Sequence, residues 1–148
     1  MEIKGLFIDG IQDYRNGFYA EAIEKFKEII KVNPKSEYAD DACYSIGWCY
    51  FEMMQFKQAI TYFEKVIEEY PDATIALSEE TGEYGKIEAK ARYAKINAFL
   101  AVGDIKATED ELQKLEALKA DSYMKTADGS KKSFYELAQA LVENYKKS

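Results

Sequence analysis

Apolar and charged residues alternate at helical spacing in the first part of the chain. Ala22, Ile23, Phe26, Ile29 and Ile30 follow the i, i+3, i+4, i+7 spacing of one apolar helix face. Glutamate and lysine residues fill the positions between them, so the opposite face is polar. A proline follows this stretch, and because proline cannot continue a helix, it marks the predicted end.

The same pattern returns 37 residues later, the distance from Pro34 to Pro71. Each unit is predicted to form two helices joined by a turn. The two units are identical at Gly10/Gly47, Ala22/Ala59, Ile23/Ile60, Phe26/Phe63, Ile30/Ile67 and Pro34/Pro71. Because glycine inside a helix costs about 1 kcal/mol relative to alanine, the repeated glycine predicts a close helix–helix crossing. We expect Ala22 and Ala59 on the facing side of that contact.

These repeated residues resemble the tetratricopeptide repeat, a helix–turn–helix motif of 34 residues. The second unit fits at Ile46, Gly47, Tyr50, Ala59, Phe63 and Pro71, with Met54 in place of the turn glycine. The first unit departs where Asp9 and Asp13 replace expected apolar residues, which a terminal repeat tolerates because it lacks a neighbour on one side. The spacing from Tyr14 to Phe26 and the Tyr70-Pro71 ending are similar to bacterial envelope repeats, among them the tol-pal system protein and the outer-membrane assembly lipoproteins.

The resemblance implies an all-α fold, a right-handed α-solenoid of three helix-turn-helix pairs plus a C-terminal capping helix, seven helices in all. The chain is interpreted as a single domain, 1–148, with repeats at about 3–36, 40–73 and 89–122, an insertion loop at about 74–86 and the capping helix at about 133–146. The third repeat is degenerate, and its second helix is expected over residues 104–120. Ser133 and Glu136 form a capping box that begins the last helix. That helix either covers the final repeat or fills the groove as an internal ligand.

Composition excludes several function classes. The chain carries 20 Lys and Arg against 27 Asp and Glu, a net charge of −7, which disfavours nucleic-acid binding. Histidine is absent, which removes His-dependent triads and His-ligated zinc. Cys43 and Cys49 would lie about 9 Å apart along a helix, so we expect two unbridged thiols in the core or at the groove edge. We therefore predict no enzyme activity, no catalytic residues, no cofactor and no metal.

The cysteines bear on the cellular location, and the spacing of the acidic residues bears on whether they form a site. Free thiols favour a cytoplasmic location, with the periplasm as the alternative if a leader was removed, and no apolar run is long enough for membrane insertion. The carboxylates Asp9/Asp13, Asp40/Asp41 and Glu79, Glu80 and Glu83 lack metal-loop spacing or a clear cationic partner. We interpret all of them as solvated.

The resemblance implies that the first helix of each repeat lines a concave groove. The groove positions are Lys4, Phe7, Ile11 and Tyr14, then Asp41, Tyr44, Trp48 and Phe51, then Lys90, Tyr93, Asn97 and Leu100. Aromatic residues among them are suited to anchor an apolar peptide or partner helix. The alternative is packing between helices, which is favoured for Phe7, Ile11 and Tyr14, whereas groove exposure is favoured for Tyr44 and Trp48.

The expected function is therefore a non-catalytic protein-protein interaction module that binds a protein or peptide with an apolar segment. The carboxylate clamp of the family, which holds an acidic tail, is rejected because only Lys90 matches its pattern. The alternatives are a self-assembling structural scaffold, in which the chain forms a homo-oligomer, and a cell-envelope assembly accessory protein.

Overall fold

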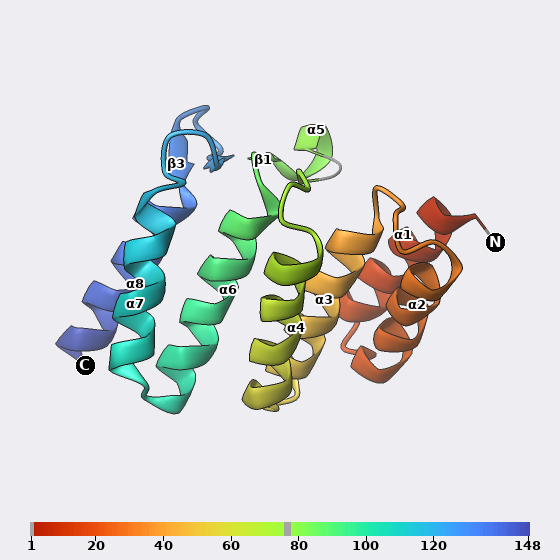
Figure 1. The fold of residues 1–148 in the computed structure, drawn as a ribbon, viewed down its shortest axis with the longest axis horizontal. Helices are drawn as coiled ribbons and strands as arrows, with labels where there is room; N and C mark the ends of the chain where they lie inside the picture. The colour runs from red at the N-terminus through yellow and green to blue at the C-terminus, as the bar shows by residue number, and fades with distance from the viewer. Residues whose placement is uncertain (1, 76–77) are drawn as a thin grey trace.

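The computed structural model describes residues 2–75 and 78–148. Helices stand side by side in a row that runs from the N-terminal end to the C-terminal end (Figure 1). The helices are α1 (Ile3–Arg15), α2 (Tyr19–Val32), α3 (Ala39–Glu52), α4 (Phe56–Glu69), α5 (Ser78–Thr81), α6 (Ile87–Val102), α7 (Ile105–Glu116) and α8 (Phe134–Lys147). The predicted all-α solenoid is confirmed. The described residues hold eight helices instead of the expected seven, because α5 adds a short one in the predicted insertion loop.

Each successive pair of helices packs on the next through an amphipathic face. In α2 the predicted apolar face is buried, with Ala22, Phe26 and Ile29 inaccessible to solvent. Helix α2 then lies against α3, and α4 lies against α6. This order gives the stacked arrangement of a solenoid, in which each unit contacts its neighbours. None of the described helices combines the length and the apolar character needed to cross a membrane.

The two mid-helix glycines mark close helix crossings, as the repeat predicted. A Cβ atom at Gly10 would lie 2.6 Å from Cε1 of Phe26, and one at Gly47 would lie 2.4 Å from Cε1 of Phe63. Ala22 and Ala59 were expected on the facing side of these crossings. Both alanines are buried, but the atoms nearest to each glycine belong to the phenylalanine ring.

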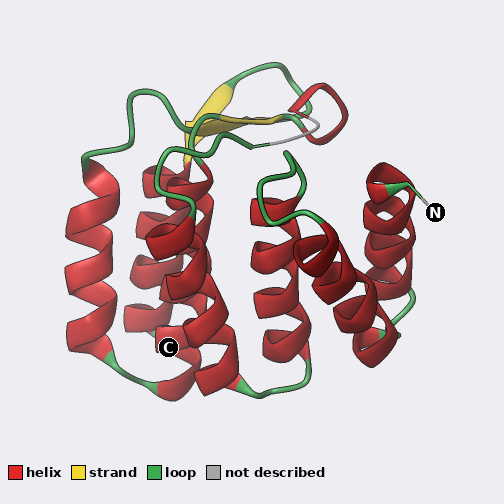
Figure 2. Cartoon of the chain, turned by 45° about the vertical axis from the view of Figure 1, so that its right-hand side comes forward, coloured by secondary structure: helices red, strands yellow, loops and turns green. Residues whose placement is uncertain are grey.

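A small antiparallel sheet joins the predicted insertion loop to a hairpin before the last helix (Figure 2). Its strands are β1 (Glu83–Tyr84), β2 (Tyr123–Lys125) and β3 (Lys131–Ser133), in the order β1-β2-β3. Glu83 pairs with Met124, and Tyr123 pairs with Ser133. The sequence did not predict this sheet. A helix was expected over residues 104–120, whereas α7 ends at Glu116.

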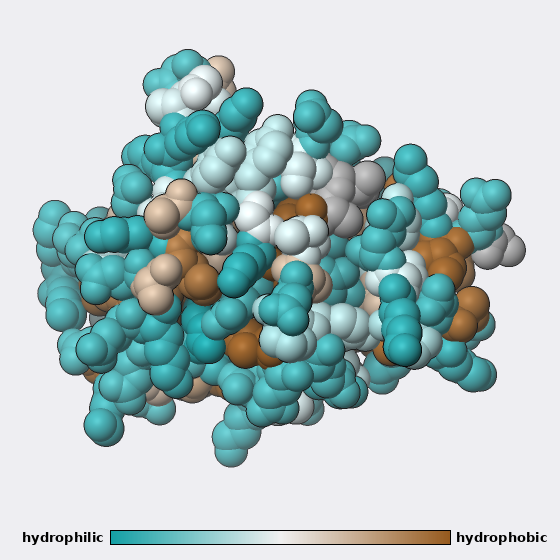
Figure 3. Space-filling view, turned by 45° about the horizontal axis from the view of Figure 1, so that its top comes forward, coloured by the Kyte–Doolittle hydropathy of each residue, from teal (hydrophilic) through white to brown (hydrophobic). Residues whose placement is uncertain are grey.

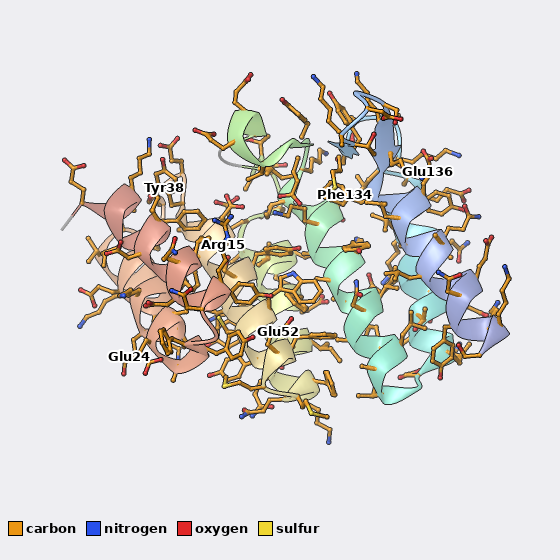
Figure 4. All side chains as sticks on the ribbon, turned by 180° about the vertical axis from the view of Figure 1, so that it is seen from behind. Arg15, Glu24, Tyr38, Glu52, Phe134 and Glu136 are labelled. Atoms are coloured by element: carbon orange, nitrogen blue, oxygen red, sulfur yellow. The ribbon has the colours of Figure 1, made fainter. Side chains whose placement is uncertain are left out.

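Helix α8 covers the third repeat. Ser133 caps its first turn, and Glu136 completes the predicted capping box. Phe134, Ala138 and Val142 are buried, and the Phe134 ring lies 6.2 Å from the ring of Tyr93 in α6. In Figure 4, Phe134 lies beside α6, while Glu136 lies on the outer side of α8. Helix α8 therefore packs on α6 and α7.

A buried ion network holds the third repeat against the second. Lys95 pairs with Glu64 of α4 and with Oε1 of Glu111 in α7, the latter at 2.6 Å. Arg92 donates from Nη1 to Oε2 of Glu111 at 2.9 Å and from Nε to Glu88 at 2.9 Å. Glu111 is only 4% exposed. This network lies beside an apolar contact between the same repeats, in which Ala59 and Phe63 of α4 pack with Ala94 of α6.

Candidate binding groove

A groove of about 880 Å³ opens between α1 and α3 and continues to the sheet end of the molecule. Its apolar walls are formed by Phe7, Ile8 and Ile11 of α1, Tyr44 and Trp48 of α3, and Met124 of β2. Residues 78–84, which comprise α5 and β1 and are called the arm below, supply Glu80, Thr81 and Glu83 to the same groove. A concave, mainly apolar site with a few polar groups is typical of ligand binding.

The structure brings together eight of the twelve predicted groove residues. Those that line the groove are Lys4, Phe7, Ile11, Tyr14, Asp41, Tyr44, Trp48 and Lys90. Phe51 instead packs against Trp48, with ring centroids 4.9 Å apart. Tyr93 contacts Phe134, and Asn97 donates from Nδ2 to the Tyr93 carbonyl oxygen at 2.9 Å. The groove therefore lies mainly on the first two repeats and takes only Lys90 from the first helix of the third.

The choice between groove and core has a different answer for each aromatic residue. Phe7 is only 7% exposed and packs on Phe26 and Tyr38, so it is mainly a core residue with one edge in the groove. Trp48 is half-buried and lies 5.5 Å from the Phe63 ring. Core packing and groove exposure are therefore not exclusive for Trp48, because its ring both supports the core and lines the groove.

Two apolar residues of the groove were missed from the sequence. Ile8 is 48% exposed, and Met124 reaches the groove from the sheet. Ile8 could have been predicted to line the groove, because it lies three residues before Ile11 on the same helix side. Met124 had no comparable signal, since its position depends on the unpredicted sheet. The face in Figure 3 is mostly hydrophilic, with small hydrophobic patches near its middle as well as toward the N-terminal helices.

One buried cation ties the arm to the solenoid. Lys90 is 8% exposed, and its Nζ donates to Oε1 of Glu83 at 2.8 Å. The same Nζ lies 4.5 Å from the centroid of the Tyr44 ring, in a cation–π contact. The interpretation of Glu83 as a merely solvated loop carboxylate is therefore wrong. Burial raises the pKa of the Tyr44 hydroxyl, so this phenol is neutral at physiological pH.

The carboxylates at the start of α3 are buried, which corrects the expectation that they are solvated. Asp40 is 3% exposed, and its Oδ2 has no hydrogen-bond partner. Burial raises the pKa of Asp40 to about 6, although backbone N–H groups and the charge of Lys90 oppose the shift. Asp41 is 5% exposed and lines the groove.

The thiols supply no evident chemistry to the groove. Cys43 and Cys49 are both buried and unbridged, as expected. Burial raises the pKa of each thiol to about 12, so the reactive thiolate is scarce at neutral pH. Among residues 2–75 and 78–148, no group of three acidic or cysteine side chains is arranged to hold a metal ion.

Comparison with known proteins places a tetratricopeptide repeat in the middle of the chain. Residues 40–73 match the family model described as tetratricopeptide repeat. A chloroplastic protein of Arabidopsis thaliana is 30% identical over 59 residues, 40% of this chain. Intraflagellar transport protein 70A of Danio rerio is 31% identical over 71 residues, 45% of this chain. These matches cover 18% and 10% of the two relatives, so the chain spans less than a fifth of either.

Solved structures share the fold over nearly the whole chain. PcrH from Pseudomonas aeruginosa superposes with a TM-score of 0.68 at 15% identity, covering 97% of this chain and 91% of PcrH. The type III secretion chaperone SycD of Yersinia enterocolitica, in complex with a peptide of the translocator YopD, gives 0.67 at 17% identity, covering 97% and 91%. The TPR2AB-domain:pHSP90 complex of yeast Sti1 gives 0.69 at 18%, covering 98% and 46%. At these sequence identities the superpositions show a shared fold, and they do not show a shared function.

Proposed function

Because the chain carries a tetratricopeptide repeat and stacks its helices as a solenoid, we propose that it is a non-catalytic protein-interaction module. Its groove holds an apolar peptide segment or helix of a partner. The observation that carries this proposal is the apolar wall between α1 and α3, in which Ile8 is 48% exposed and Trp48 is half-buried. Covering such side chains removes apolar surface from water, and aromatic residues are preferred anchors in interfaces.

The similar folds support the proposal. SycD is described with a peptide of YopD, and the Sti1 domain is described with pHSP90, so solenoids of this shape hold peptides. An acidic peptide tail, the ligand of the family's carboxylate clamp, finds no free lysine at the matching position of this groove. Lys90, the single residue that fits the clamp pattern, already pairs with Glu83.

The proposal is tested by selecting from a display library of random 16-residue peptides on the purified chain. Ile8→Glu places a charge on the groove wall, and Val32→Glu places one at a 59% exposed site outside it. We expect wild type and Val32→Glu to enrich the same peptides and Ile8→Glu to lose them. Trp48 emission should shift to the blue when an enriched peptide binds. If no peptide is enriched, or if Ile8→Glu keeps them all, the groove is not a binding site.

A second candidate function, self-assembly, is favoured by an exposed apolar edge. Phe18 and Met54 lie at the turns of the first two repeats, and Val102 ends the first helix of the third. All three are more than half exposed. The solution mass of the chain, compared with that of Met54→Lys, tests this candidate. The cell-envelope subtype and the cellular location stay predictions.

A further inference from the structure

We propose that the occupant of the groove is an amphipathic α-helix, with acidic residues on the flank that faces α1 and basic residues on the flank that faces the arm. This inference rests on the proposed function and names the class of partner. It is drawn from the backbone requirements of a ligand, from the shape of the two walls and from the charges on the two rims.

The apolar part of the groove offers an extended backbone few hydrogen-bond partners, whereas Gln12, Ser45 and Thr81 are polar residues of the same lining. Its walls at Ile8, Ile11 and Met124 are hydrocarbon or thioether. Two of its polar groups are already engaged, since the Tyr14 hydroxyl donates to Glu52 at 3.3 Å and Lys90 donates to Glu83. An extended segment buried here would leave N–H and C=O groups unpaired, which is costly. A helix satisfies these groups internally and presents only side chains.

The two walls have the spacing that a third helix requires. On α3, Asp41, Tyr44 and Trp48 line the groove at i, i+3 and i+7. On α1, Ile8, Ile11 and Arg15 do so at the same spacing. Each set spans about 10 Å, two helical turns. An apolar stripe that recurs at i, i+3 or i+4 and i+7 on the partner would run along both walls.

The chain itself shows a helix in the corresponding position of the third repeat. Tyr93 occupies the place in α6 that Tyr44 occupies in α3, since both lie ten residues before the turn residues Gly103 and Met54. Phe134 of α8 packs on Tyr93. Among the described residues, Tyr44 packs on Phe63 and Lys90 but has no contact with α8, and it lines the open groove instead. A partner helix would give Tyr44 the kind of contact that α8 gives Tyr93.

The rims of the groove carry opposite charges. The α1 rim presents Lys4 and Arg15, and the arm on the opposite rim presents Glu80, all three of them exposed. Glu83 on that side is neutralised by Lys90. A helix with acidic residues toward α1 and basic residues toward the arm complements both rims, and such charges set orientation and partner choice.

The first experiment asks whether the enriched 16-residue peptides bind as helices. We expect apolar residues at i, i+3 or i+4 and i+7, and a gain of helical circular dichroism on binding. A proline placed in the middle of the polar face, which leaves every apolar side chain in place, should weaken binding at least tenfold. If the peptides alternate apolar and polar residues, or if the proline leaves the affinity unchanged, the helix inference is overturned while the proposed function stands. If no peptide is enriched, the proposed function fails first.

The second experiment tests the rim charges with the same peptides. Arg15→Glu should weaken binding several-fold at low salt, and a Glu→Lys change on the facing flank of the peptide should restore it. Lys27→Glu makes the same charge change at an exposed site on α2, outside the groove, and should have little effect. Equal losses for Arg15→Glu and Lys27→Glu would overturn the flank assignment, because the effect would then follow net charge alone.

Discussion

The ring of Phe63 lies over the backbone of Gly47, where a Cβ atom would sit 2.4 Å from Cε1. This contact closes the second helical pair and also places the groove, because the same ring lies 5.7 Å from Tyr44 and 5.5 Å from Trp48. The position of the groove aromatics therefore depends on a glycine on the buried side of their own helix.

Replacing Gly47 with alanine should destabilise the chain by about 1–3 kcal/mol, because the added methyl group overlaps a fully buried ring. The free energy of unfolding in urea measures the loss. Phe63→Leu provides the matched test, since it removes the clashing atoms. The double variant should lose less than the sum of the two single variants, and simple additivity would contradict the contact.

Neutralising Glu111 should lower the free energy of unfolding, because it weakens the buried ion network. Glu111→Gln leaves Lys95 and Arg92 with one carboxylate fewer in a buried site, and we expect a loss of about 2–4 kcal/mol. Glu116→Gln is the control on the same helix, because Glu116 pairs with Lys119 at 3.9 Å on the surface. The control should lose less than about 1 kcal/mol. Denaturant midpoints that shift equally for both variants would rule out a structural role for the network.

The stability that Asp40 contributes should depend on pH. Its folded pKa of about 6 lies above the ordinary value of 3.8, so the folded state binds the proton more tightly. That contribution is fully present below pH 3.8 and is lost as the pH rises through 6. Relative to wild type, Asp40→Asn should therefore gain about 1–3 kcal/mol between about pH 4 and pH 7. Unfolding measured across this range checks the slope, and a flat difference would mean that Asp40 ionises freely in the folded state.

Truncating the Phe134 ring should loosen the cover of the third repeat. Phe134→Ala removes a side chain that is 2% exposed and contacts Tyr93, so we expect a loss of about 3–5 kcal/mol. Tyr145→Ala changes an aromatic residue that is 40% exposed near the end of the same helix and should cost far less. Thermal unfolding compares the two, and similar midpoints would show that α8 is not anchored through Phe134.

The helices and their crossings could be predicted because the same residues recur in the first and second repeats. Gly47 and Phe63 recur as Gly10 and Phe26, so the pattern identifies a shared contact. The residue nearest to each glycine was not identified, because alanine and phenylalanine four residues apart lie on the same helix side. Sequence spacing cannot separate two such neighbours, whereas the length of the ring decides which one reaches the glycine.

The sheet and the ion network could not be predicted for a different reason. Strands β1, β2 and β3 are two or three residues long, too short for a period-two pattern. Lys95 and Glu111 are common surface residues in helices, and only the packing of α4, α6 and α7 buries them. Most of the predicted groove residues follow from helix position alone. Met124 and the arm residues do not, because their placement requires the sheet.

The pairing of Glu83 with Met124 changes how the molecule unfolds. In a simple solenoid each repeat interacts only with its neighbours, so one end can fray while the rest stays folded. Here the sheet connects the arm to the hairpin that leads into α8, and it joins parts of the chain that a linear array keeps separate. Unfolding of α8 would release β3, then β2, and with them the Met124 and Glu83 sides of the groove. We therefore expect opening of α8, which contributes no residue to the lining, to lower the fraction of molecules with a complete groove.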